Sequence, residues 1–274
     1  MVNDVVERGK RAGDPRSPEG NEPPPVLWHL KVSHYNEKAR WALDYKRVPH
    51  IRHAATPGRH AKIARRLGAG TTFPVLEIDG QVLGDSTLII RELERRYPEP
   101  SLYPEGADER RRALELEDFF DEELGPYLRL LVIQHMLPDP SLLLGAFTPD
   151  LAGPRRWVTR AIYPLIRRGI VRDFGIDSAG VQRAWEKCRL ACACFDAERG
   201  QSGYLVGDRF TVADLTLAAL LSPAVAPEQF PYPQPQRGHA RLDDLRAMLD
   251  DRGALEWTRW IYAQHRPRSM AVAG

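Results

Sequence analysis

Apolar residues follow two different spacings along the chain, and the change falls near residue 98. Before it, short apolar runs alternate with stretches of helical periodicity. Two runs are typical of strands, and a third is typical of a hairpin because Asp79-Gly80 suits a tight turn with positive backbone angles. The predicted order is therefore β-α-β-α-β-β-α, with strands expected at 26–30, 50–55 and 74–84 and helices at 36–46, 59–67 and 86–97.

Beyond residue 98 the strand patterns stop, and only helical patterns follow. A long amphipathic pattern is expected to break at Gly125-Pro126, because proline lacks an N–H and clashes with the preceding turn. The helical segments are expected at 109–137, 154–172, 180–199, 211–221 and 241–265. The predicted organisation is a polar, disordered tail at 1–24, an α/β domain at 25–98, a linker at 99–107, an all-α domain at 108–266 and a short tail at 267–274.

Composition and charge exclude several function classes. The 274 residues are 43% hydrophobic and 28% charged with a net charge of +2, and no basic face for nucleic acid is expected. No apolar run suits a transmembrane helix, and the first residues do not resemble a secretory signal, so no membrane partner is expected. The three cysteines lack a framework spacing, which favours a cytoplasmic protein. No histidine near Cys188, Cys192 and Cys194 completes a metal site, so none is expected.

Polar side chains gather where the first strand pattern meets the first helix pattern, in "VSHYNEKARWAL" (32–43). Ser33 is a candidate N-cap for this helix. Alternatively, a hydroxyl at a helix N-terminus can donate a hydrogen bond to a thiolate, and the helix dipole then also lowers the pKa of the thiol. His34, Tyr35 and Asn36 are within reach and are further candidates. The stretch contains no cysteine, so the protein cannot form a mixed disulfide there.

Two other positions each permit a structural and a functional interpretation. Pro74 between Phe73 and Val75 is either a tolerated proline at a strand start or part of a cis bond that frees the backbone of Val75 for an extended ligand. Ser86 is either an ordinary N-cap or a hydroxyl donor at a helix N-terminus that holds a carboxylate. In the second case, Asp85 can pair with an amine of the ligand.

Three segments together resemble the cytosolic glutathione transferase superfamily. They are "SHYNEKARWAL", "FPVLEIDGQVLGDSTLIIRELERRYPEPSLYP" and "GYLVGDRFTVADLTLAALL". The first two match in order and spacing, and the third is a helical-domain signature in which Thr211 and Asp214 have the spacing of a capping box. Elsewhere the resemblance is one of pattern only. It implies a thioredoxin-like N-terminal domain, an all-α C-terminal domain and a homodimer.

The resemblance also implies where ligands bind. In serine-type members the catalytic hydroxyl begins the first helix, which by position is Ser33, whereas members that exchange disulfides carry a cysteine there. The electrophile pocket would lie on the first helix of the all-α domain, with Tyr127, Leu131 and His135 on one face. The implied glutathione-binding residues are Thr72, Phe73, Pro74, Val75, Asp85 and Ser86, with Pro74 in cis.

Two departures from the family pattern stand out. Thr71 and Thr72 occupy the place of a basic or amide residue that often contacts the glycyl end of glutathione. The segment 222–240 is rich in proline and aromatic residues, and we expect it at the rim of the pocket. These departures affect the identity and affinity of the thiol more than the fold.

We therefore expect an enzyme that ionises bound glutathione with the help of Ser33 and the first helix dipole. The thiolate would attack a small apolar electrophile between the two domains. Conjugation, dehalogenation and isomerisation share this step, and the sequence does not choose among them. The alternative is a binding protein for an apolar ligand or a protein partner with little turnover, which Thr72 favours.

Overall fold

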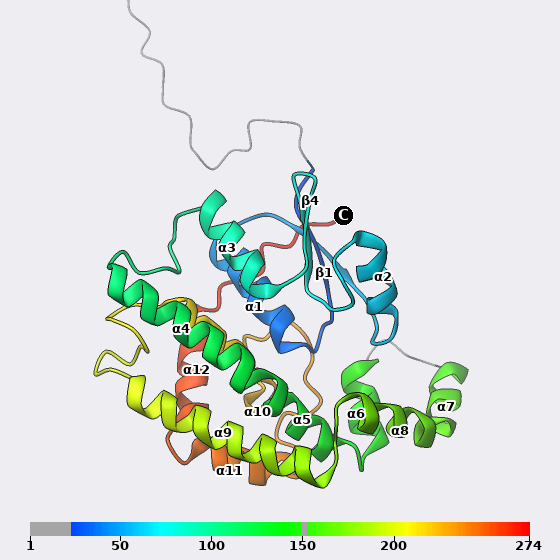
Figure 1. The fold of residues 1–274 in the computed structure, drawn as a ribbon. Helices are drawn as coiled ribbons and strands as arrows, with labels where there is room; N and C mark the ends of the chain where they lie inside the picture. The colour runs from blue at the N-terminus through cyan, green and yellow to red at the C-terminus, as the bar shows by residue number, and fades with distance from the viewer. Residues whose placement is uncertain (1–22, 149–152) are drawn as a thin grey trace, which may run out of the picture.

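The computed structural model describes residues 23–148 and 153–274 and contains one four-stranded mixed sheet (Figure 1). The strands are β1 (Val26–His29), β2 (Ile51–Ala54), β3 (Val75–Ile78) and β4 (Gln81–Leu83), in the order β2-β1-β3-β4. β1 pairs with β2 in parallel and with β3 antiparallel. The hairpin turn has the expected positive φ angles at Asp79 (46°) and Gly80 (74°). This arrangement confirms the predicted thioredoxin-like domain.

Three helices flank this sheet: α1 (His34–Tyr45), α2 (Arg59–Leu67) and α3 (Ser86–Arg96). Neighbouring residues of a strand face opposite sides of the sheet. Leu27 and Leu76 accordingly join the main core with α1 and α3. Val75 joins a smaller cluster with Ala64 of α2. Because both sides are covered, the central strands β1 and β3 carry apolar residues on both faces, which explains their nearly continuous apolar runs in the sequence.

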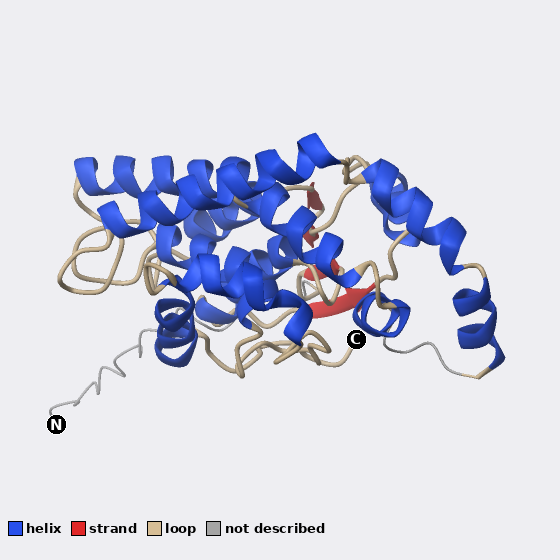
Figure 2. Cartoon of the chain, turned by 90° about the horizontal axis from the view of Figure 1, so that it is seen from below, coloured by secondary structure: helices blue, strands red, loops and turns tan. Residues whose placement is uncertain are grey.

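The second half of the chain is helical, and the strands form only a small part of the molecule (Figure 2). Its helices are α4 (Ala107–Glu123), α5 (Gly125–Met136), α6 (Pro140–Phe147), α7 (Pro154–Ala161), α8 (Tyr163–Asp173), α9 (Ser178–Glu198), α10 (Val212–Val225), α11 (Asp243–Asp250) and α12 (Ala254–His265), with a 3-10 turn η1 at Ala240–Leu242.

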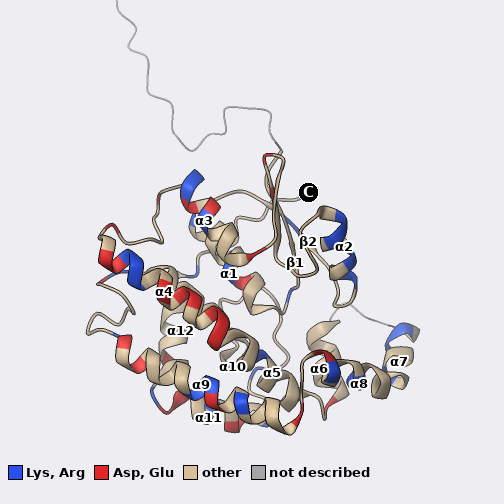
Figure 3. Cartoon of the chain, in the orientation of Figure 1, with Lys and Arg blue, Asp and Glu red and all other residues tan. Residues whose placement is uncertain are grey.

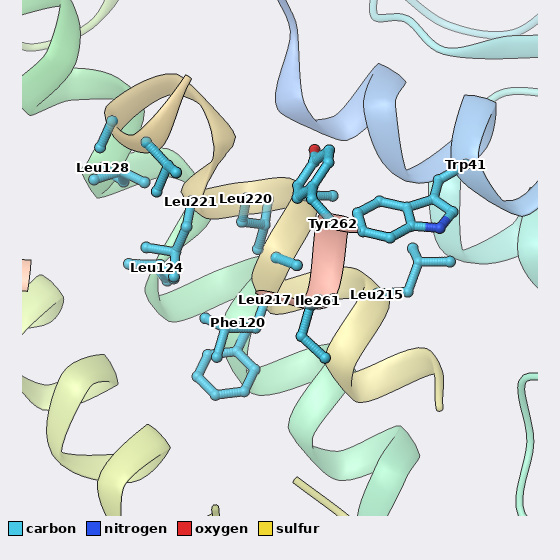
Figure 4. Packing of buried hydrophobic residues seen from close by; sticks show 14 of the residues in the cluster. Trp41, Phe120, Leu124, Leu128, Leu215, Leu217, Leu220, Leu221, Ile261 and Tyr262 are labelled. Atoms are coloured by element: carbon cyan, nitrogen blue, oxygen red, sulfur yellow. The ribbon is translucent and has the colours of Figure 1, made fainter. Parts of the chain in front are cut away.

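α10 is the centre of the helical half, and all of its residues are buried. It packs against α1, α4 and α12, so it joins the two domains through one core. Figure 4 shows its leucines among side chains of these helices, including Trp41 and Tyr262. The predicted capping box is confirmed at its start, where the Asp214 carboxylate accepts a hydrogen bond from the backbone N–H of Thr211 (2.8 Å).

Most predicted helices are confirmed, and so is the break at Gly125-Pro126, where α4 ends and α5 begins. Three differences remain. The pattern at 154–172 forms two helices because Pro164 cannot continue the backbone hydrogen bonding of α7. The pattern at 241–265 is divided by Gly253, which has a positive φ of 71°. α6 was not predicted.

The C-terminal segment (266–272) returns to the N-terminal domain. The backbone N–H of Met270 donates to the Asp44 carboxylate (2.8 Å), and that of Val272 donates to the carbonyl of His50 (2.9 Å). Arg266 is buried and forms ion pairs with Asp44 (2.8 Å) and Glu37 (2.7 Å) of α1. The segment predicted as a short tail is therefore bound beside the start of β2.

Two further expectations from the sequence concern the N-terminal tail and a membrane-spanning helix. The predicted polar tail at 1–24 falls almost wholly outside them. Within 23–148 and 153–274, no helix is both long enough and apolar enough to cross a bilayer.

Replacing Arg266 with methionine should destabilise the protein by about 3–5 kcal/mol, because two buried carboxylates would lose their cation. Urea denaturation measures this change in the free energy of unfolding. The matched control is Arg252→Met, which removes an exposed ion pair with Asp196 and should cost about 0–1 kcal/mol. Equal effects of the two substitutions would contradict a structural role for the C-terminal segment.

Candidate functional site

A cavity of about 1070 Å³ lies between the two domains. The N-termini of α1 and α3 and the loop before β3 form one side, and α4, α5, α6 and α8 supply most of the rest. The structure brings eight of the predicted site residues to its wall: Ser33, His34, Tyr35, Thr72, Phe73, Pro74, Asp85 and Ser86.

Asn36 joins three parts of this wall. Its side-chain oxygen accepts a hydrogen bond from the backbone N–H of Leu30 at the end of β1 (2.9 Å). Its Nδ2 donates to the carbonyl of Phe73 (3.1 Å) and to Oγ of Ser33 (2.7 Å). Because Asn36 is fully buried, losing any of these bonds would leave an unpaired polar group. Asn36 is thus a positioning residue for Ser33.

Ser33 is the N-cap of α1, as its sequence position predicts. Its oxygen accepts hydrogen bonds from the backbone N–H of Asn36 (3.5 Å) and from the Asn36 side chain. These bonds use the lone pairs of the hydroxyl oxygen and leave its hydrogen without an acceptor among the described residues. The adjacent end of α1 adds partial positive charge. A hydroxyl donor beside such charge suits an anionic ligand atom.

The side chains after Ser33 are engaged with α4 and α5. Tyr35 donates its hydroxyl hydrogen to the carbonyl of Asp121 (2.6 Å), and burial, reinforced by Asp121, raises the pKa of Tyr35. A Cβ atom on Gly125 would lie 2.2 Å from this hydroxyl oxygen, so Tyr35 can approach the start of α5 this closely only beside glycine. Burial lowers the pKa of His34 to about 3. Its ring is therefore neutral near pH 7.

The Phe73-Pro74 peptide bond is cis, as the resemblance implies. The loop that contains this bond lines the cavity with Thr72, Phe73 and Pro74. Val75 is the first residue of β3, pairs with Trp28 of β1 and packs beside α2. Its side chain lies outside the cavity wall, and the use of its backbone by a ligand stays a prediction.

Asp85 is the N-cap of α3, and the expectation that Ser86 caps this helix is wrong by one residue. One Asp85 oxygen accepts hydrogen bonds from the backbone N–H groups of Thr87 (2.8 Å) and Leu88 (3.1 Å). The shift leaves the Ser86 hydroxyl without a hydrogen bond to any described residue. Ser86 is buried at the cavity wall beside the positive end of α3, where a carboxylate binds well.

α4 carries a group of acidic residues (Figure 3), and Asp118, Asp121 and Glu122 of this helix line the cavity. Behind it, Lys38 of α1 is buried between the carboxylates of Glu117 (3.2 Å) and Asp121. The hydroxyl oxygen of Thr87 lies 3.0 Å from a carboxylate oxygen of each acid. One lysine thus faces two carboxylates, and Oδ1 of Asp121 is buried with no partner in the described part of the chain. This side of the cavity suits an ammonium group.

The part of the wall formed by α5, α6 and α8 is largely apolar but contains Arg129 of α5. Its guanidinium lies 5.2 Å from the ring centre of Phe174, and burial lowers its pKa. Its Nε is buried without an acceptor, and no carboxylate of residues 23–148 or 153–274 forms an ion pair with it. A half-buried guanidinium with no ion-pair partner in the described ranges suits an anionic group of a ligand. The apolar neighbours include Val132, Ile133, Met136, Leu143, Phe147 and Ile170.

The predicted electrophile-pocket residues on α5 are directed away from the cavity. The ring of His135 lies 6.0 Å from that of Trp185, and Tyr127 lies beneath Lys187, both from α9. Leu131 is fully buried in the core. α5 is apolar around most of its circumference, so helical spacing alone could not identify the side that faces the cavity. That side carries positions 129, 132, 133 and 136.

Several polar residues at the cavity wall were not predicted as site residues, among them Arg129, Asp121, His60 and Gln236. Arg129 and Asp121 were not distinguishable from other charged residues on their helices. His60 of α2 lies near Phe73, with ring centres 5.9 Å apart. Gln236 also lines the cavity, and its position confirms that the segment 222–240 reaches the pocket. Of these, only Gln236 belonged to a stretch whose composition was unusual.

Across the described ranges, no group of three or more His, Cys, Asp or Glu side chains could hold a metal ion. Cys188 and Cys192 are buried on α9, and burial raises the pKa of both thiols. Buried cysteines of this kind are unreactive core residues.

Comparisons with known proteins agree on one family. Residues 27–101 match the family model "Glutathione S-transferase, N-terminal domain", and residues 178–256 match "Glutathione S-transferase, C-terminal domain". The chain is 26% identical to a maleylacetoacetate isomerase of Dictyostelium discoideum over 79% of this chain and 88% of that protein. It is 30% identical to a maleylpyruvate isomerase of Ralstonia sp over 70% of this chain and 76% of that protein.

A solved structure shares the fold. The glutathione S-transferase of Ceriporiopsis subvermispora, in complex with glutathione, superimposes with a TM-score of 0.57 and 16% identity. The match covers 90% of this chain and 99% of that structure.

The neutral state of His34 predicts a pH dependence of stability. Its pKa falls from the ordinary 6.5 to about 3 on folding, so the unfolded chain binds a proton that the folded chain does not. The contribution of His34 to stability is therefore complete above pH 6.5 and is lost as the pH falls toward 3. Between these values, the free energy of unfolding should change by about 1.4 kcal/mol per pH unit more in the wild type than in His34→Gln.

Urea denaturation at several pH values measures the two slopes. The matched control is His53→Gln, because His53 is exposed, and it should leave the slope as in the wild type. Equal slopes for wild type and His34→Gln would show that His34 is not held neutral by burial.

Proposed function

The chain belongs to the glutathione S-transferase superfamily, and from this premise we propose that it is a glutathione-dependent enzyme in which Ser33 stabilises the ionised thiol. The observation that carries the proposal is the hydrogen bonding of Ser33. Asn36 fixes its oxygen from two directions, and its hydrogen is left for a ligand at the cavity wall. Tyr35 is a weaker candidate because its hydroxyl hydrogen is already donated to Asp121.

In this proposal glutathione lies along the loop 72–74 and the start of α3. Its γ-glutamyl carboxylate accepts hydrogen bonds from Ser86 and the N-terminus of α3, and its ammonium group faces Asp85 and the acidic side of the cavity. His60 lines the cavity beside Phe73, and we assign it to the glycyl carboxylate, since Thr72 stands where family members often carry a basic or amide residue. The charges of the tripeptide and of the wall are then complementary.

The chemistry needs little beyond this placement. The bound thiol releases its proton to solvent, and the thiolate is held by the Ser33 hydroxyl and the dipole of α1. Its sulfur then forms a bond to an electrophilic carbon in the apolar part of the cavity, and that carbon gives up a π bond or a leaving group in the same step. Because both reactants are held together, the enzyme gains chiefly from positioning and from the lowered pKa of the thiol.

We infer that the electrophile carries an anionic group as well as an apolar part. Arg129 of α5 lies in the cavity wall with no ion-pair partner in the described part of the chain, and it can pair with a carboxylate. The names of the isomerases from Dictyostelium discoideum and Ralstonia sp favour isomerisation of an unsaturated acid. In that reaction the thiolate adds to the double bond, the new single bond rotates, and the carbon–sulfur bond breaks to return the thiolate.

Ser33→Ala and Ser86→Ala should have different effects. Loss of the Ser33 hydroxyl should raise the pKa of bound glutathione by about 1–2 units, because a hydrogen bond to a charged group is lost. Turnover should fall about 100-fold, with little change in glutathione affinity. Ser86→Ala should weaken binding about tenfold and leave the pKa of the bound thiol unchanged. Calorimetry measures the binding, and thiolate absorbance against pH measures the pKa.

Two results would contradict this assignment. If Ser33→Ala had the turnover rate of the wild type, Ser33 would act only as a helix cap. Absence of binding by the wild type at millimolar glutathione would remove the enzyme proposal and favour the binding-protein alternative.

Arg129→Met should raise KM for an unsaturated carboxylic acid by about 10- to 100-fold, because a charged hydrogen bond is lost. KM for the neutral methyl ester of the same acid should stay nearly constant. Steady-state kinetics with the acid and the ester separate these effects, and Arg183→Met on the exposed side of α9 is the matched control. Equal losses for acid and ester would assign Arg129 a structural role only.

A further inference from the structure

α7 and the start of α8 place apolar side chains on the outside of the molecule. Trp157 is 76% exposed, Val158 60%, Ile162 45% and Leu165 72%. These four are half of the eight large exposed hydrophobic residues found in 23–148 and 153–274. On the other side of α7, Thr159 lines the cavity. The more apolar side of this helix is therefore turned away from the protein, the reverse of ordinary helix packing.

The same segment is strongly basic. Residues 154–173 contain six arginines and a single acidic residue, Asp173, whereas the whole chain has a net charge of only +2. Four exposed arginines have no ion-pair partner in the described part of the chain: Arg155, Arg156, Arg167 and Arg168. Together with Trp157, Val158, Ile162 and Leu165 they form what we call the α7–α8 surface.

No described part of the chain covers this surface. α7 and α8 lie at the margin of the molecule in Figure 1, and α7 packs chiefly against α8. None of the α7 residues is buried, and Tyr163 is the one buried residue of α8. Four exposed apolar side chains in one segment, bordered by arginines, mark an interaction surface.

We propose that the α7–α8 surface binds peripherally to a bilayer that contains anionic phospholipids. A short amphipathic segment with Trp and Leu on one side and Arg beside them suits the boundary between head groups and acyl chains. The arginines are attracted by anionic head groups, and Trp157 has the apolar ring and polar N–H that this boundary favours. The sequence predicts no membrane partner because no segment could span a bilayer. Peripheral binding needs no spanning segment.

A second copy of the chain is a poorer occupant. In a symmetric dimer formed through this surface, the arginines of one copy would face the same unpaired arginines of the other, and like charges at close range oppose association. An anionic bilayer offers opposite charge over its whole area. The proposal does not depend on the catalytic assignment, since none of its residues holds glutathione.

Binding of the full-length protein to vesicles tests the proposal. Phosphatidylcholine vesicles with phosphatidylglycerol should retain the protein at low salt, whereas pure phosphatidylcholine vesicles should not. Trp157→Ser combined with Leu165→Ser should weaken the binding about tenfold or more, because two exposed apolar side chains lose their contact with the lipid. Arg155→Gln combined with Arg156→Gln should weaken it by about fivefold for each charge removed.

The matched controls are Leu190→Ser, an exposed leucine of α9, and Arg65→Gln combined with Arg66→Gln on α2. Both should bind like the wild type. No retention on anionic vesicles, or equal losses in the controls, would overturn the proposal. It would also be overturned if analytical ultracentrifugation showed an oligomer that Trp157→Ser dissociates, because the surface would then join copies of the chain.

Discussion

Burial of four charged residues in one helix constrains the rest of this fold. α1 is covered on nearly all sides, and Glu37, Lys38, Arg40 and Asp44 are each fully buried. Every one of them needs a partner, since an unpaired buried charge costs several kcal/mol. Lys38 is paired with α4, Glu37 with Arg40, and both Glu37 and Asp44 with Arg266 of the C-terminal segment. α4 and the C-terminal segment, which lie far apart in the sequence, must therefore both pack against α1.

This constraint also fixes the cavity wall. With α1 held by its charges and by α10, its N-terminus has a defined position against the cis bond before Pro74. Asn36 then sets the position of Ser33 through bonds that reach β1 and the Phe73 carbonyl. A hydroxyl held in this way loses little further freedom when a ligand anion arrives, which is the physical basis of preorganisation.

Local sequence signals predicted the parts of the structure that short segments determine. The hairpin at Asp79-Gly80, the break at Gly125-Pro126 and the capping box before α10 were all recognisable, because a few neighbouring residues decide each conformation. What depends on distant contacts was not. The ion pairs of Arg266 join residues more than 220 positions apart, and the position of Arg129 depends on which side of an apolar helix meets the cavity.

The two sides of the cavity differ in how firmly they are held. The side with Ser33 and Ser86 rests on α1 and the sheet, whose residues belong to the central core. The far side includes α8, which has one buried residue, and Thr159 of α7, which has none. Regions with few buried contacts open at low free-energy cost. Glutathione would therefore meet a rigid surface, whereas the electrophile would meet a wall that adjusts to its shape, and substrate choice can change there without disturbing the part that activates the thiol.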